Sequence, residues 1–160
     1  MYKIGQLMEN RAKLYNWSYY RAIMKNDLDM IKYLHKKGYE YGELEIQHAI
    51  IKGNFDIFVF LYQHNKNDAK NQEDINILYL HYATIHGKGD IHIMMWLCEN
   101  IQYKIDVIER TIRLMKLANL NFYETSSHVD ANLDYRNPQQ IEKWLSKYLR
   151  MRKLSQAYIL

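Results

Sequence analysis

One nine-residue pattern recurs three times in this chain, at residues 26–34, 53–61 and 89–97. Each copy begins with Asn or Gly, carries apolar residues at its third, fifth and sixth positions, and ends in an aromatic residue followed by Leu. The second copy starts 27 residues after the first, and the third starts 36 residues after the second. Self-similarity at spacings of roughly 20–50 residues indicates a repeat architecture, in which each unit buries its apolar face against its neighbours.

The spacing inside the pattern predicts helices. In the first copy the apolar positions are 28, 30, 31, 33 and 34, which is a helical stripe and not an alternation. An Asp or Asn near each start can cap the free N–H groups of a helix. A second predicted helix precedes the first two copies and carries Ala22 or Ala49, seven residues before the Asp. Each unit is therefore expected to be a helix, a short turn rich in Gly or Asn, and a second helix.

The middle copy lacks most of the polar positions, so we expect its second helix to be buried on nearly all sides. The apolar residues at matched positions are expected to form the core of the repeats. They are Ala22, Leu28, Ile31, Leu34, Ala49, Phe55, Phe58, Leu61, Ile91, Met94 and Leu97.

The whole chain is predicted to be one all-α domain, residues 1–160, of stacked helix-turn-helix repeats with helical caps at both ends. Its length suits one core, and six Gly and a single Pro are too few for the turns of an all-β fold. Residues 63–74 and 124–136 are expected to be loops, and a helix is expected at 75–86. The remaining elements are an N-terminal helix at 1–18, three helix pairs within 19–100, a helix at 103–118 and a basic helix at 138–158 that starts at Pro138.

The formal net charge of +4 is concentrated in the last predicted helix, which contains five basic residues and one acidic residue, Glu142. Capping of the open end of the stack is one interpretation, because repeat arrays need an end element with a polar outer face. The others are binding to an acidic protein surface, and binding to phosphate backbones or an anionic membrane surface. Tyrosine is abundant and enriched at interfaces, so it is a second candidate feature. The partner-binding candidates are Lys143, Lys147, Arg150, Arg152, Lys153, Tyr39 and Tyr41.

Catalytic and metal-binding motifs were sought and not found in the sequence. His81, His86, His92 and Cys98 are spaced by five, six and six residues, which does not match the paired ligands of structural zinc sites. We therefore predict no catalytic residue, no cofactor and no metal. The single Cys, the polar start and the absence of a long apolar run predict a cytoplasmic protein without a membrane span.

The pattern A-x-x-x-G-N-x-D-I, with its aromatic-Leu ending, resembles ankyrin repeats in their divergent viral forms over residues 19–100. The T-P-L-H turn of ordinary ankyrin repeats is missing, which favours plain helix stacking without long hairpins. With its Tyr, Met, Ile, Asn and Lys bias, the chain resembles the multigene-family proteins of asfarviruses and other large cytoplasmic DNA viruses. The resemblance implies a non-enzymatic accessory factor that binds a host signalling or innate-immunity protein. The alternative is a nucleic-acid-binding protein that uses the basic helix at 138–158.

Overall fold

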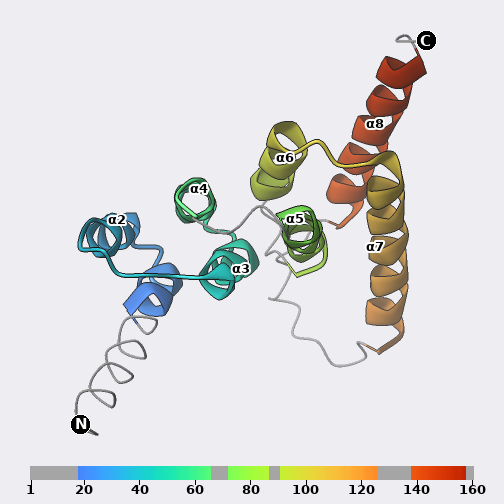
Figure 1. The fold of residues 1–160 in the computed structure, drawn as a ribbon. Helices are drawn as coiled ribbons and strands as arrows, with labels where there is room; N and C mark the ends of the chain where they lie inside the picture. Colours follow the sequence, from blue (N-terminus) through green and yellow to red (C-terminus); the bar gives the residue numbers. More distant parts are fainter. Residues whose placement is uncertain (1–17, 66–71, 87–90, 126–137, 158–160) are drawn as a thin grey trace, which may run out of the picture. The chain divides into compact units, whose positions relative to one another are not determined.

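The computed structural model describes residues 18–65, 72–86, 91–125 and 138–157. These residues are mainly helical, and none of them lies in a β-strand (Figure 1), so the prediction of an all-α fold is confirmed. The chain falls into two compact units, Met1–Asn67 and Asp68–Leu160, and each is described by itself. The single-domain prediction for 1–160 stays a prediction. Most of the N-terminal helix predicted at 1–18, and the turn predicted at 87–89, lie outside the described residues.

The first unit contains helical residues 18–24, α2 (Leu28–Lys36), α3 (Glu43–Lys52) and α4 (Phe55–Gln63). Two of its turns have the same hydrogen bonds, 27 residues apart. Asn26 has a φ of 54° and Gly53 a φ of 70°, and each donates its amide to the carbonyl three residues before it. The following residues, Asp27 and Asn54, each donate to the carbonyl five residues before them. This pair of bonds satisfies the last carbonyls of a helix and reverses the chain direction.

Side-chain hydrogen bonds link the helices of the first unit to the segments that connect them. The hydroxyl of Tyr19 donates to the carbonyl of Tyr39 at 3.1 Å, and that of Tyr41 donates to the carbonyl of Leu61 at 2.8 Å. The buried side-chain amide of Asn54, in the second turn, donates to the carbonyl of Ile23 near the first turn. Because an unsatisfied buried polar group is unfavourable, these bonds fix how the helices pack.

Helix α4 shows why the middle copy of the pattern lacks most of the polar positions. Ile57, Phe58 and Leu61 are buried, and of its residues only Asp56 and Gln63 are exposed. In α2, by contrast, Met30 and Tyr33 are 44% and 53% exposed. An apolar helix of this kind is stable only when other elements cover most of its surface.

The second unit contains α5 (Gln72–His81), the π-helix η2 (Tyr82–His86), α6 (Ile91–Asn100), α7 (Ile105–Thr125) and α8 (Pro138–Ala157). Figure 1 shows α7 and α8 side by side and running in opposite directions. The unit has its own core, in which two tyrosine hydroxyls donate to backbone carbonyls, from Tyr103 to Asn76 and from Tyr148 to Cys98. Its buried apolar residues include Tyr79, Leu80, Ile93, Met94, Leu97, Ile108, Met115, Ile141 and Leu145.

The helices of the second unit differ from those predicted in three respects. Helix α5 begins at Gln72, within the predicted loop, because Glu73 and Asp74 are polar but suit the first turn of a helix electrostatically. Helix α7 runs from Ile105 to Thr125, beyond the predicted end at 118. The helix predicted at 75–86 ends in a π turn, where the Thr84 hydroxyl donates to the carbonyl of Leu80 at 2.8 Å. Helix α8 starts at Pro138 as expected.

The predicted repeat residues divide into two groups. Leu28, Phe55 and Ile91 are half-buried, and each is the first residue of its helix. The others are buried, namely Ala22, Ile31, Leu34, Ala49, Phe58, Leu61, Met94 and Leu97.

Candidate binding surface on helix α8

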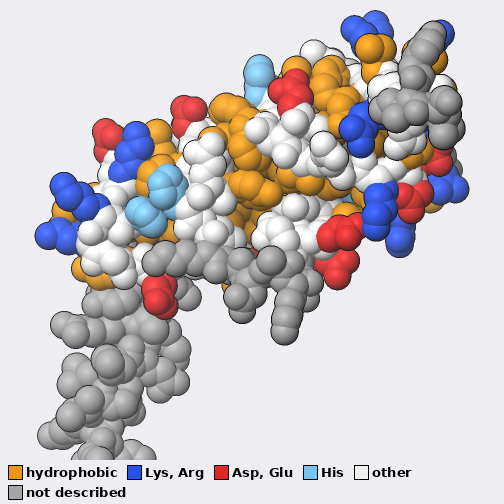
Figure 2. Space-filling view, turned by 45° about the horizontal axis from the view of Figure 1, so that its top comes forward, with side chains coloured by type: hydrophobic (Ala, Val, Ile, Leu, Met, Phe, Trp, Pro, Cys, Tyr) orange, Lys and Arg blue, Asp and Glu red, His pale blue; other side chains and the backbone are white. Residues whose placement is uncertain are grey.

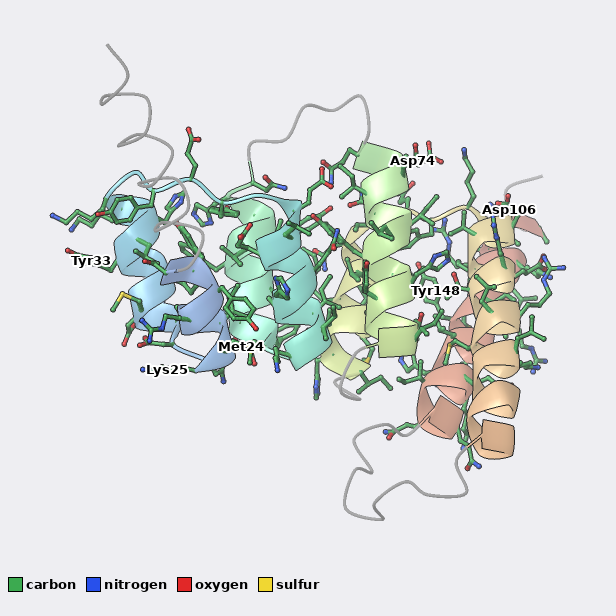
Figure 3. All side chains as sticks on the ribbon, turned by 90° about the horizontal axis from the view of Figure 1, so that it is seen from below. Met24, Lys25, Tyr33, Asp74, Asp106 and Tyr148 are labelled. Atoms are coloured by element: carbon green, nitrogen blue, oxygen red, sulfur yellow. The ribbon has the colours of Figure 1, made fainter. Side chains whose placement is uncertain are left out.

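Helix α8 has one face turned toward the core of its unit. Ile141 and Leu145 are buried on that face, and the Tyr148 hydroxyl donates to the carbonyl of Cys98 at 2.6 Å. Figure 3 shows Tyr148 directed from α8 toward the interior of the second unit. These contacts define which side of the helix remains available to a partner.

Lys143, Lys147 and Arg150 lie on the opposite face of α8. Their spacing of four and three residues places them on one side of an α-helix, roughly 180° around the axis from Leu145. All three are exposed, and among the described residues none of them is paired with an acid. They form a row of three positive charges about 10 Å long, given a rise of about 1.5 Å per residue. We call these three residues the basic row.

Arg152 and Lys153 were also predicted from the sequence to bind a partner, but both have contacts inside the unit. Arg152 is half-buried and donates from Nη2 to the carbonyl of Tyr103 at 3.3 Å. Lys153 Nζ lies 2.6 Å from Glu109 Oε1. These two cations therefore hold α8 against its neighbours, and only the other three are available for a partner.

An open groove of about 290 Å³ lies between α7 and α8. Ile112 and Leu149 supply its apolar lining, one from each helix, and Glu109 and Arg113 complete it. Figure 2 shows basic side chains, with acidic ones among them, gathered over this part of the molecule. Sequence reasoning missed Arg113 and the groove, because the pairing of α7 with α8 is not visible in either helix alone.

Two of the acids on α7 and α8 form ion pairs between these helices. Glu109 pairs with Lys153, and Glu142 pairs with Lys116 across the helices at 3.2 Å. Arg113 is exposed and has no acidic partner among the described residues. The surface of α7 and α8 therefore retains an excess of positive charge after its own ion pairs are formed.

Tyr39 and Tyr41, the aromatic candidates, belong to the first unit. The Tyr41 ring packs against Tyr19 with centroids 5.2 Å apart, and its hydroxyl is bonded to Leu61. Burial raises the pKa of Tyr41 to about 12. The carbonyl of Tyr39 accepts the hydroxyl of Tyr19. The hydroxyl of Tyr41 is thus used within the fold, and the sequence carries no signal for it because its acceptor is a backbone carbonyl.

The histidines and the cysteine were candidate metal ligands in the sequence. In the part of the chain that the structure describes, no group of three or more His, Cys, Asp and Glu side chains gathers to hold a metal ion. Burial, with Glu99 acting in the same direction, raises the pKa of Cys98 to about 12, so the thiol is protonated and unreactive at neutral pH. Burial and the charge of Arg110 lower the pKa of His81, while His92 is exposed.

No helix among the described residues is long and apolar enough to cross a membrane. Comparison of the chain with protein-family models, with curated proteins and with solved structures finds no match. The resemblance to viral ankyrin-like proteins therefore remains an expectation drawn from the sequence.

Proposed function

We propose that this chain is a non-enzymatic binding module that docks an acidic surface of a partner protein through the basic row of Lys143, Lys147 and Arg150. The observation that carries the proposal is the row itself. It lies on the face of α8 away from the core, exposed and without acidic partners among the described residues.

The basic row is unfavourable for the isolated helix. Like charges three or four residues apart on a helix destabilise it by roughly 0.2–0.5 kcal/mol for each pair. The basic row contains two such like-charge pairs, Lys143 with Lys147 and Lys147 with Arg150. A cap that only needed a polar outer face would be better served by mixed charges. A partner with carboxylates would remove the repulsion, which supports binding over capping alone.

The size of the row favours a protein partner over nucleic acid. Proteins that bind duplex DNA often neutralise roughly 6–10 phosphates, along a basic surface. Here three cations are available within one short row, fewer than a protein that tracks a continuous phosphate backbone would use. Carboxylates one helical turn apart on a partner would match the spacing of the row.

The repeat arrangement is part of this proposal. Support comes from the turns at Asn26 and Gly53, which lie at matching positions of two copies of the pattern, although the turn at Gly38 between the copies has the same hydrogen bonds. The sequence resemblance adds that the partner is a host signalling or innate-immunity protein in the cytoplasm and that the chain is viral. On this proposal the helix stack holds α8 in place, and binding blocks or redirects the partner.

The test compares two triple charge reversals. One changes the basic row to Glu, as K143E/K147E/R150E, and the matched control changes three exposed lysines of the first unit, as K25E/K32E/K36E. The probe is a labelled Ala-rich helical peptide with Glu at every fourth position, which places its carboxylates on one face. We expect the peptide to bind the wild type and the control and to lose binding to the row variant.

A duplex DNA probe in the same assay separates the two partner classes. DNA binding stronger than peptide binding, with a steep fall as salt is raised, would favour the nucleic-acid alternative. Absence of peptide binding to the wild type, or equal loss in both variants, would contradict the proposed function.

A further inference from the structure

We infer that the acidic partner segment is an amphipathic helix that inserts an apolar side chain into the groove between α7 and α8. The inference rests on the proposed function and adds the chemistry and shape of the bound segment.

The groove is open to solvent and has apolar residues at its centre. Ile112 from α7 and Leu149 from α8 line it. The ion pair of Lys153 with Glu109 lies toward one end, and that of Lys116 with Glu142 lies toward the other. Its volume of about 290 Å³ leaves room for a large aliphatic or aromatic side chain, since a cavity of about 150 Å³ accepts benzene.

Positive charge borders the groove on both helices. Arg113 lines it from α7, and Arg150 follows directly after the lining residue Leu149 on α8. Neither arginine has an acidic partner among the described residues, whereas Glu109 and Glu142 are both paired. The complementary ligand therefore has one apolar side chain with carboxylates on either side of it.

A helix fits this surface better than an extended strand does. Two long antiparallel helices form a groove that accepts the ridge of a third helix, as in other helix-in-groove complexes. The basic row repeats with the pitch of a helix, so a helical ligand presents carboxylates at the same intervals. An extended segment would place successive carboxylates out of step with the row.

The experiment uses two peptide probes and three variants of the full chain. The probes are the Ala-rich Glu peptide of the previous test and the same peptide with one central Ala replaced by Leu. Leu149→Ala enlarges the groove, and Arg113→Glu changes its charge at an exposed position that leaves the fold intact. Leu154→Ala is the matched control, because Leu154 is also on α8 but is 46% exposed and does not line the groove.

We expect the Leu peptide to bind the wild type about tenfold more tightly than the Ala peptide, because its side chain is buried in the groove. This gain should disappear in Leu149→Ala, both peptides should weaken in Arg113→Glu, and Leu154→Ala should behave as the wild type does. Circular dichroism on each variant shows that the helices are retained.

The outcomes that overturn the inference are distinct from those that overturn the proposed function. Equal affinity of the two peptides for the wild type, with both lost in the basic-row variant, would reject the groove and retain the row. A Leu gain that survives Leu149→Ala or disappears in Leu154→Ala would also reject the groove. If neither peptide binds, the proposed function itself fails.

Discussion

The two units of the chain achieve helix packing by different means. In the first, helices of nine or ten residues are joined by tight turns, and buried side chains such as Asn54 donate to backbone carbonyls. In the second, two helices of about twenty residues lie side by side, with exposed ion pairs between them. In the first unit the hydroxyl of Tyr41, a binding candidate in the sequence, donates a hydrogen bond within the fold. Long helices in the second unit leave one face without contacts, and that face carries the basic row.

The largest expected effect comes from placing a charge in the core of either unit. Phe58 and Leu145 are both fully buried, so Phe58→Asp and Leu145→Asp should each destabilise their own unit by about 4 kcal/mol or more. Amide hydrogen exchange, read helix by helix, measures the loss. If α7 and α8 lose protection together with the first unit in Phe58→Asp, residues 1–160 unfold as the one domain that the sequence predicts. Wild-type protection of α4 in that variant would contradict its buried position.

The next largest effect is a loss of folding stability at alkaline pH. Burial first, and Glu99 second, raise the pKa of the Cys98 thiol in the second unit from 9.0 to about 12. The folded state binds this proton more tightly than the unfolded state does. Its contribution to stability is therefore complete below pH 9 and is lost as the pH rises toward about 12.

Cys98→Ala removes this titrating group, so its free energy of unfolding should fall less steeply above pH 9 than that of the wild type. Urea unfolding at a series of pH values measures the difference. Parallel curves for the two proteins would show that the thiol does not change its pKa on folding.

A smaller effect tests whether the two turns of the first unit are equivalent. Gly53→Ala places a Cβ at a φ of 70° and should destabilise the protein by about 1 kcal/mol. Asn26→Gly relieves a similar strain at a φ of 54° and should change stability less, in the opposite direction. Urea midpoints of the two variants measure both. Changes of the same sign would show that the turns do not share a backbone requirement.

The smallest effect concerns the ion pair between α7 and α8. Glu109→Gln should reduce stability by roughly 0.2–1 kcal/mol, because the pair with Lys153 is exposed, and the reduction should vanish at high salt. Glu99→Gln is the control, since Glu99 is exposed and lies in no ion pair within the described residues. A large loss of stability in Glu109→Gln that does not depend on salt would mean that this ion pair is needed to keep α7 and α8 packed beside the groove.

The sequence predicts the helices well where periodicity and turn chemistry agree. The second helices of the pattern were found because apolar positions follow a helical period and begin after Asn, Asp or Gly. The start of α5 was missed because its first turn has no apolar residue, only Gln72, Glu73 and Asp74. Local sequence does not reveal a helical turn that is polar and becomes helical because the residues after it pack in the core.

The candidate surface was predicted only in part, for a physical reason. All five basic residues lie on α8, but which of them are free depends on the alignment of α8 with α7. That alignment brings Glu109 to Lys153 and the carbonyl of Tyr103 to Arg152. Contacts between residues far apart in the chain decide it, and neither helix carries a local signal for them. The same holds for the groove and for Arg113.

The π turn of η2 has a consequence for how this chain tolerates changes in length. A π turn accommodates one residue more than the corresponding turn of an α-helix, so the helix can absorb an insertion without changing which residues face inward beyond it. From Ala83 to His92 the chain takes nine residues, against seven from Ala22 to Asp29 and from Ala49 to Asp56, and Ala83 is buried at 2% exposure, as Ala22 and Ala49 are. A π turn at this point can absorb one of the two added residues. Length variation between related chains should therefore gather in η2 and spare α6.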